Sequence, residues 1–269
     1  MDIQSITILQ GHGKAFQQDK IERLTLEMGN VVSVVGPTGS GKTTLINDIA
    51  LFANNNTPSG RTILINSQLP PDEYLYDPSK NPVAFITQHT NFLSDLPVQK
   101  FLEFHIRIRH SYAKQSLLNE VLNFANQLTG EPIDVNSSMT ELSGGQTRSL
   151  LIADAVVIGN SPIILLDEIE NAGIDRTRAL ELLRNYRKIF IFVTHDPRIT
   201  LLSDFRIIME HGSMEQVLIT HDEEKRAIHA ITKLDDILLG LRAIIRSGNV
   251  VREQYLKEQL LQFGFVAAA

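Results

Sequence analysis

The chain has 269 residues and a net charge of −6 at pH 7, and its 43% hydrophobic and 21% charged residues are typical of a globular protein. It contains no cysteine, which excludes disulfides, zinc–thiolate sites and thiol catalysis. The mild negative charge provides no general attraction to nucleic acid or anionic lipid, and we expect neither a signal peptide nor a membrane-spanning segment.

The first part of the chain is predicted to be rich in strands. Alternating or continuous apolar residues predict strands at Ile3–Gln10, Ile21–Met28, Val31–Val35, Arg61–Asn66 and Val83–Thr87. The intervening segments Gly11–Phe16 and Pro70–Pro78 are predicted to be loops, because turn-forming residues dominate them.

The hydrophobic period then changes from strand-like to helical. From Val98 to Leu128 the apolar residues recur about every 3.6 residues, which predicts a helical insertion over about residues 92–140 in an otherwise α/β chain. Strand patterns return at Ile163–Leu166 and Ile189–Val193. A hairpin is predicted from Arg206–Glu210 and Met214–Thr220.

The chain after Thr220 is predicted to be helical. Asp222 is the expected N-cap of a long helix that Gly248 ends, and a second short helix is expected over Val251–Phe263. One apolar stripe runs along the long helix: Ile228, Ile231, Leu234, Leu238, Leu241 and Ile245. The stripe fits either core packing or a dimer seam, and we expect core packing. We therefore expect a domain over residues 1–220 and a helical extension over residues 221–269.

A glycine-rich segment joins the strand Val31–Val35 to a helical pattern. Its residues are Gly36, Pro37, Thr38, Gly39, Ser40, Gly41, Lys42, Thr43 and Thr44. This order of strand, loop and helix is that of a phosphate-binding P-loop, whose N–H groups face the phosphates. Lys42 is expected to reach the β- and γ-phosphates, and the Thr43 hydroxyl to bind Mg²⁺. The alternative is a turn that contains a lysine by chance.

Two carboxylates follow the strand predicted at Ile163–Leu166. Asp167, at the strand end, is suited to hold the Mg²⁺ of a nucleotide on the P-loop, directly or through water. Glu168 can act as general base for an attacking water, or orient it. The alternative is a solvated acidic pair.

A serine and two glycines precede a further helical run. The segment comprises Leu142, Ser143, Gly144, Gly145 and Gln146. It offers a hydroxyl and several N–H groups to an anion, but the same residues also fit an N-capped helix with a flexible lead. The residues alone leave both interpretations open.

Five segments, in order and spacing, resemble the Walker A, Q-loop, signature, Walker B and switch-histidine motifs of the ABC ATPase family. They are Gly36–Thr44, Gln88, Leu142–Gln146, Asp167-Glu168 and His195. The resemblance extends from about Ile3 to Gln216. It implies a P-loop NTPase with an α/β core, an antiparallel β subdomain and a helical subdomain that carries the signature. It also implies that two cassettes meet head to tail, so that the Ser143 loop of one closes over ATP held by Lys42 of the other.

The resemblance also implies roles for single residues. Gln88 matches the glutamine that touches Mg²⁺ and the attacking water, and His195 matches the histidine that contacts the γ-phosphate. Arg148, just past the signature, is expected to brace its own loop or to be solvated, rather than to touch the nucleotide. Phe16 is the nearest candidate for the aromatic residue that stacks on adenine, against a plain core phenylalanine. The turn after Asp167-Glu168 is one residue longer than the family pattern, and Asp175 is the best match to the aspartate of that turn.

The implied function is a Mg²⁺-dependent ATPase that dimerises on ATP and serves as the motor subunit of an ABC transporter. Its expected partners are a second copy and separate transmembrane permease subunits, which would hold it at the cytoplasmic face of the membrane; no nucleic acid is expected. The alternative is a soluble, non-transport ABC ATPase that remodels a protein or nucleic-acid complex. A regulatory subunit without turnover is disfavoured, because the hydrolytic residues are all present.

Overall fold

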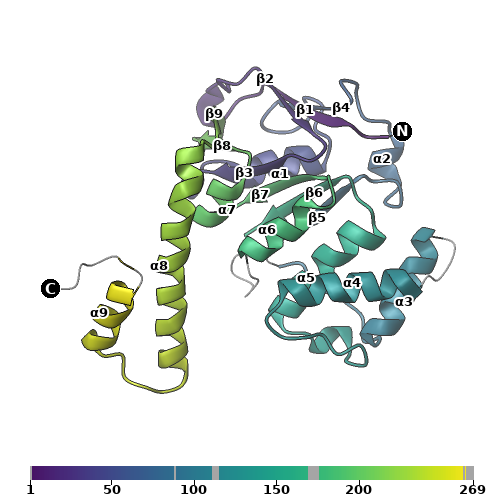
Figure 1. Cartoon of the computed structure of the whole chain (residues 1–269). Helices are drawn as coiled ribbons and strands as arrows, with labels where there is room; N and C mark the ends of the chain where they lie inside the picture. The colour runs from purple at the N-terminus through teal and green to yellow at the C-terminus, as the bar shows by residue number, and fades with distance from the viewer. Residues whose placement is uncertain (1, 88, 111–114, 169–175, 263, 265–269) are drawn as a thin grey trace. The chain divides into compact units, whose positions relative to one another are not determined.

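The protein is described by a computed structural model that covers residues 2–87, 89–110, 115–168, 176–262 and 264. Its internal contacts divide the chain into two units, Met1–Ile219 and Thr220–Ala269 (Figure 1). This boundary lies one residue before the one expected from the sequence.

The first unit contains two sheets (Figure 1). A three-stranded antiparallel sheet has the order β2-β1-β4, and a six-stranded sheet has the order β5-β6-β7-β3-β8-β9. Neighbours in the larger sheet are parallel except β8 and β9, which form the predicted hairpin. The strands are β1 (Ser5–Leu9), β2 (Arg23–Glu27), β3 (Val31–Val35), β4 (Thr62–Ile65), β5 (Val83–Ile86), β6 (Ile163–Asp167), β7 (Ile189–Val193), β8 (Phe205–Glu210) and β9 (Ser213–Ile219). All the predicted strands are confirmed, with ends within two residues of those expected.

Helices separate these strands along the chain. In the first unit they are η1 (Lys14–Phe16), α1 (Lys42–Ala50), α2 (Glu73–Tyr76), α3 (Val98–His110), α4 (Gln115–Leu128), η2 (Met139–Glu141), α5 (Gly144–Ala153), η3 (Asp154–Ile158), α6 (Arg176–Arg184) and α7 (Pro197–Leu202). The predicted helical insertion is confirmed by α3 and α4. The prediction of a loop over Pro70–Pro78 was wrong at α2, where Tyr74 is buried with its ring 6.0 Å from that of Phe52.

The six-stranded sheet is covered on both faces. Side chains alternate across a strand, so Ile163 and Leu165 of β6 pack with α1 and the small sheet. Ile164 and Leu166 pack on the opposite face with the helices α3 to α7. Burial on both faces explains why β7 and the first four residues of β6 are continuous apolar runs, and why β3 is apolar except for the buried Ser33, rather than alternating patterns.

The strand order brings distant segments together. β3 lies beside β7, and β7 lies beside β6. Parallel strands end at the same edge of a sheet, and ligands bind at that carboxyl edge in open α/β folds. The loops that follow β3, β6 and β7 therefore meet, although more than 100 residues separate β3 from β6.

The described residues of the second unit form the helices α8 (Asp222–Arg246) and α9 (Glu253–Gln262). The predicted N-cap was wrong by one residue: the helix begins at Asp222, so His221 is the N-cap, and its N–H donates a hydrogen bond to the Glu224 carboxylate at 3.3 Å. Gly248, with φ +76°, follows the helix end as predicted. Within the described part of the chain, no helix is both long and apolar enough to cross a bilayer.

The predicted core stripe of α8 was partly wrong. Leu234, Leu238 and Ile245 are exposed, whereas Ile237, which the stripe omits, is only 3% exposed. Side-chain burial is set by the partner that a helix meets, and α8 contacts α9. A Cβ atom on Gly240 would lie 2.9 Å from the Tyr255 hydroxyl, so a side chain there would displace the Tyr255 side chain.

A buried lysine lies directly before β7. Lys188 is 4% exposed and donates hydrogen bonds to Asn160 Oδ1 at 2.8 Å and to the Ser161 carbonyl at 3.0 Å. Both acceptors are neutral, and burial lowers the pKa of Lys188 to about 8.

This pKa predicts how stability depends on pH. An exposed lysine in the unfolded chain keeps its proton up to about pH 10.5, so the unfolded state binds more protons than the folded state above pH 8. The free energy of unfolding should therefore rise by roughly 1 kcal/mol between pH 7 and pH 9 through this group. Urea denaturation of the wild type and of Lys188→Met at both pH values checks it. Equal changes in the two proteins would contradict the assignment.

Candidate functional site

A cavity of about 590 Å³ lies where β3, β6 and β7 end. Residues singled out from the sequence line it: Thr38, Gly39, Ser40, Gly41, Lys42, Thr43, Thr44, Asp167, Glu168 and His195. The remaining lining residues are His12, Gly13, Lys14, Pro58, Ser59, Val193 and Gly212. The structure thus joins the glycine-rich loop, the two carboxylates and the histidine around one space.

The glycine-rich loop adopts a conformation that requires glycine. Gly39 and Gly41 have φ values of +77° and +93°. A Cβ atom on Gly41 would also lie 2.6 Å from the Gly212 Cα, at the tip of the β8–β9 hairpin. Gly41 is the N-cap of α1, and it has no side chain to cap the first turn. The N–H groups of this turn are therefore available to an anion.

Lys42 is held inside the loop. Its ammonium donates to the carbonyls of Gly36 at 2.8 Å and Pro37 at 3.1 Å. Burial lowers the pKa of Lys42, while the Glu168 and Asp167 carboxylates act in the opposite direction. Phosphate oxygens are better acceptors for an ammonium than neutral carbonyls, so a polyphosphate can replace them.

Ser40 supports the same interpretation. Its Oγ is buried and has no hydrogen-bond partner within the described residues, although Ser40 lines the cavity. A buried hydroxyl without a partner is costly, and a phosphate oxygen would provide one. The loop, Lys42 and Ser40 together fit a polyphosphate.

The two carboxylates come from the end of β6. Asp167 is the register partner of Val193 on β7, and the Glu168 N–H donates to the Val193 carbonyl at 3.0 Å. Glu168 has φ +51°, in the left-handed region that non-glycine residues rarely adopt. Such conformations cost energy and concentrate at functional sites. The backbone here holds both carboxylates at the cavity beside Lys42.

The segment Leu142–Gln146 does not line this cavity. Ser143 caps α5: its Oγ accepts from the Gln146 N–H at 3.3 Å, and Gln146 Oε1 accepts from the Ser143 N–H at 2.9 Å. The N-capped-helix interpretation is therefore correct within one chain. Ser143 and Gly144 are exposed, and Arg148 donates to the Gly144 carbonyl at 2.9 Å, so it braces its own loop as expected.

Two residues expected from the sequence lie outside the described residues. They are Gln88, matched to the Q-loop, and Asp175, the best match to the aspartate of the turn after Glu168. Phe16 is described but is 79% exposed and does not line the cavity. Its ring lies 4.9 Å from that of His12, which does.

Sequence reasoning missed the wall formed by His12, Pro58 and Ser59. These residues stand in turn-rich segments that carry no phosphate-binding pattern. The only local sign was Gly11, which lets two loops approach: a Cβ atom there would lie 2.3 Å from the Ser59 carbonyl oxygen.

Known proteins share this architecture. The family model for ABC transporters matches residues 20–171. An uncharacterized ABC transporter ATP-binding protein of Methanocaldococcus jannaschii, MJ0121, is 46% identical over 92% of this chain and 95% of its own length. The sulfate/thiosulfate import ATP-binding protein CysA of Synechococcus elongatus is 31% identical over 76% of this chain, which spans 58% of that protein.

One similar solved structure is that of the ATP-binding cassette MJ0796, a dimer in a post-hydrolysis state with ADP and phosphate. Its TM-score against this chain is 0.59, and the sequence identity is 23%. The match covers 80% of this chain and 99% of that one. The fold is thus that of a P-loop cassette, and the range matched by the family model contains the segments from Gly36–Thr44 to Asp167-Glu168. This chain belongs to the ABC transporter family as one of its ATP-binding cassettes, which are ATPases.

Proposed function

We propose that this cassette closes into a dimer on ATP and drives transport through separate membrane-spanning permease subunits. One observation carries the dimer: Ser143 and Gly144 are exposed and lie outside the cavity that Lys42 and Glu168 line. A single chain therefore holds only one side of the nucleotide. A second copy, placed head to tail, supplies the other side through the N-terminus of α5.

Within one chain, different residues of the cavity bind the phosphates, activate the attacking water and contact the γ-phosphate. Lys42 and the N–H groups at the start of α1 bind the β- and γ-phosphates. Glu168 orients the water that attacks the γ-phosphorus in line with the leaving oxygen, and accepts its proton. His195 contacts the γ-phosphate and, with Ser143 of the second copy, stabilises the charge that develops on it.

The donor set also fits a magnesium ion. The Thr43 hydroxyl and the Asp167 carboxylate line the cavity and are the oxygen ligands that Mg²⁺ prefers, and the motif match adds Gln88. When bound, Mg²⁺ supplies positive charge that neutralises the phosphate oxygens.

We assign the adenine contact to His12 rather than Phe16. The His12 ring lines the cavity, whereas Phe16 packs against His12 from outside it. A ring supported by a second ring keeps its orientation, which favours stacking on a flat base. Pro58 and Ser59 complete this part of the wall.

The transport role is supported by the relatives. CysA and others are named as import ATP-binding proteins, and their matches cover 72–77% of this chain. A permease partner would bring the cassette to the cytoplasmic face of the membrane. The alternative is a soluble ABC ATPase acting on a protein or nucleic-acid complex. MJ0121 aligns over 248 residues, more than Met1–Ile219 contains, so its match reaches into the C-terminal unit, and that protein is also named an ABC transporter ATP-binding protein.

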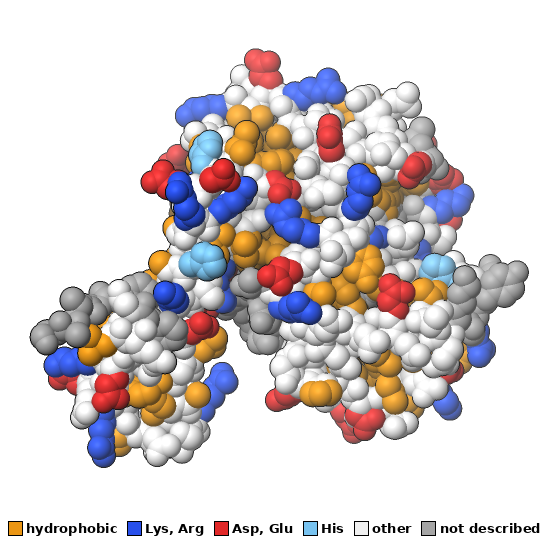
Figure 2. Space-filling model, viewed as in Figure 1, with side chains coloured by type: hydrophobic (Ala, Val, Ile, Leu, Met, Phe, Trp, Pro, Cys, Tyr) orange, Lys and Arg blue, Asp and Glu red, His pale blue; other side chains and the backbone are white. Residues whose placement is uncertain are grey.

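Surface charge gives the alternative no further support. On the face shown in Figure 2, lysine and arginine side chains are interspersed with aspartate and glutamate. A nucleic-acid-binding face would gather basic residues.

An affinity-tagged full chain expressed in its native host tests the proposal. We expect Mg²⁺-dependent ATP hydrolysis by the purified protein, and co-purification with a polytopic membrane protein after detergent extraction. Recovery only with a soluble complex would overturn the transport role and favour the alternative. Absence of hydrolysis, with and without the membrane partner, would instead indicate a subunit without turnover.

A further inference from the structure

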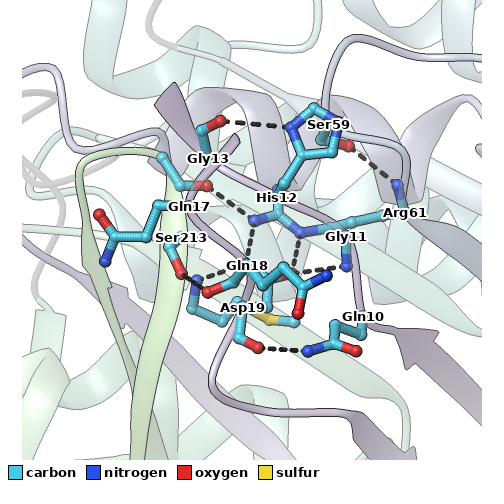
Figure 3. A network of polar contacts seen from close by, with 12 residues as sticks. Gln10, Gly11, His12, Gly13, Gln17, Gln18, Asp19, Ser59, Arg61 and Ser213 are labelled. Atoms are coloured by element: carbon cyan, nitrogen blue, oxygen red, sulfur yellow. Dashed lines mark hydrogen bonds and ion pairs between the residues drawn. The ribbon is translucent and has the colours of Figure 1, made fainter. Parts of the chain in front are cut away.

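A buried arginine lies between two buried aspartates beside the cavity. Arg61, directly before β4, is 0% exposed. Figure 3 shows it with one of the two aspartates, Asp19. Its Nε and Nη2 donate to the two carboxylate oxygens of Asp19 at 2.8 and 2.7 Å, and its Nη1 donates to Asp48 Oδ2 at 3.2 Å. We call Asp19, Asp48 and Arg61 the buried charge cluster.

Backbone groups complete the shell around Asp19 and Arg61. Asp19 accepts hydrogen bonds from the N–H groups of Gly11 at 3.0 Å and Met214 at 2.7 Å, and Arg61 Nη2 donates to the Gly212 carbonyl at 2.7 Å. Burial by itself raises the pKa of Asp19. Arg61 and these N–H groups lower the pKa by more than burial raises it, so the net pKa of Asp19 is below its ordinary value. Asp19 is therefore an anion at neutral pH.

Asp48 connects the cluster to two neighbouring segments. It belongs to α1, the helix that follows the glycine-rich loop. Its carboxylate accepts from the hydroxyls of Thr57 and Ser59, each at 2.8 Å. Arg61 therefore sits where the loop Gly11–Asp19, α1, the segment after α1 and the hairpin tip meet.

Each of these four segments contributes residues to the lining of the cavity, together with the glycine-rich loop and the ends of β6 and β7. The His12 N–H donates to the Ser59 carbonyl at 2.7 Å, and the Lys14 N–H donates to the His211 carbonyl at 2.7 Å. The Lys14 ammonium reaches the Gly39 carbonyl of the glycine-rich loop at 3.2 Å. None of the three cluster residues lines the cavity, so the cluster acts through backbone segments that do.

A buried charge cluster is a weak source of stability. Taking three charges out of water is costly, and apolar residues of similar volume commonly match or exceed the stability of a buried ion pair. What a bidentate arginine provides is fixed direction, because its planar fork holds both carboxylate oxygens at once. The cluster is therefore better explained by the geometry that it imposes than by stability.

We infer that the buried charge cluster positions the wall of His12, Pro58 and Ser59 against the glycine-rich loop, and so sets the affinity for the nucleoside part of ATP. The inference rests on the proposed nucleotide site. Arg61 is a positioning residue, and it acts on the bound nucleoside through Ser59, His12 and the hairpin tip. The triphosphate is held by Lys42 and α1, whose loop geometry is set by its own glycines.

The affinities for two ligands distinguish the role of the wall from that of the glycine-rich loop. ATP uses both the wall and the loop, whereas inorganic tripolyphosphate uses the loop alone. In the Arg61→Met protein we expect the Kd for ATP to rise by about tenfold or more, while the Kd for tripolyphosphate stays within about twofold. Arg61→Lys keeps the positive charge but lacks the planar guanidinium that binds both carboxylate oxygens, and it should recover part of the lost ATP affinity.

The measurement is isothermal titration with Mg²⁺ on the full-length chain, alongside thermal unfolding. Asp48→Asn, which keeps the side-chain shape, replaces Arg61→Met if the latter does not fold. Lys188→Met is the matched control, since it removes another buried cation that does not line the cavity; it should leave the ratio of the two Kd values unchanged.

The possible outcomes distinguish a failure of the positioning role from a failure of the proposed nucleotide site. A wild-type protein that binds neither ligand would overturn the nucleotide site itself. If the wild type binds both ligands and the Arg61 or Asp48 variants keep the wild-type ratio of Kd values, or lose both ligands equally, the positioning role is overturned. A selective loss of ATP affinity, partly recovered by Arg61→Lys, supports it.

Discussion

Replacing Glu168 by glutamine is expected to lower kcat for ATP hydrolysis by a factor of about 100 to 10,000, with the Kd for ATP within about twofold of the wild type. Glutamine has the same size and can still orient a water molecule, but it cannot accept a proton at neutral pH. Because Lys42 and the α1 N-terminus bind the phosphates, ATP binding does not depend on this carboxylate.

The same variant should accumulate as an ATP-dependent dimer, because ATP closes the two copies and is no longer consumed. Steady-state phosphate release and light scattering with and without ATP measure both effects. Glu73→Gln is the control: it makes the same chemical change in a surface ion pair with Lys80 that does not line the cavity. Full turnover by Glu168→Gln would remove Glu168 from the mechanism.

Two inactive variants should restore hydrolysis when they are mixed. Lys42→Ala removes the ammonium that binds phosphate, and Ser143→Arg places a bulky side chain at the exposed start of α5. In a head-to-tail dimer, a mixed pair contains one site with both Lys42 and Ser143 intact. Random one-to-one mixing should then recover about a quarter of wild-type turnover, if the sites act independently.

Each variant assayed alone sets the baseline for this experiment. Mixing Lys42→Ala with a double variant that carries both substitutions is the matched control, because no pairing of these chains contains an intact site. Mixed dimers that form, detected by differently tagged chains, yet stay inactive would show that Ser143 and Lys42 do not share one ATP.

Much of the fold was readable from local patterns. β3, β6 and β7 are almost wholly apolar because the sheet is covered on both faces, and such strands carry a strong signal. The hairpin of β8 and β9 and the end of α8 at Gly248 follow from residues that act within a few positions. The helix α2 and the buried face of α8 were misjudged, because burial depends on a distant partner.

The residues of the site also fall into those that local sequence patterns predict and those that only the tertiary structure brings together. The amino-acid sequence by itself determined the glycine-rich loop, Lys42, Asp167-Glu168 and His195, since each stands at the end of a strand and chemistry requires that residue type there. Only the tertiary structure decided that His12, Pro58 and Ser59 form the opposite wall and that Arg61 is buried between Asp19 and Asp48. Arg61 bonds Asp19, 42 positions away, and the Gly212 carbonyl, 151 positions away. No local periodicity encodes such a meeting, because it arises when separate segments fold against one another.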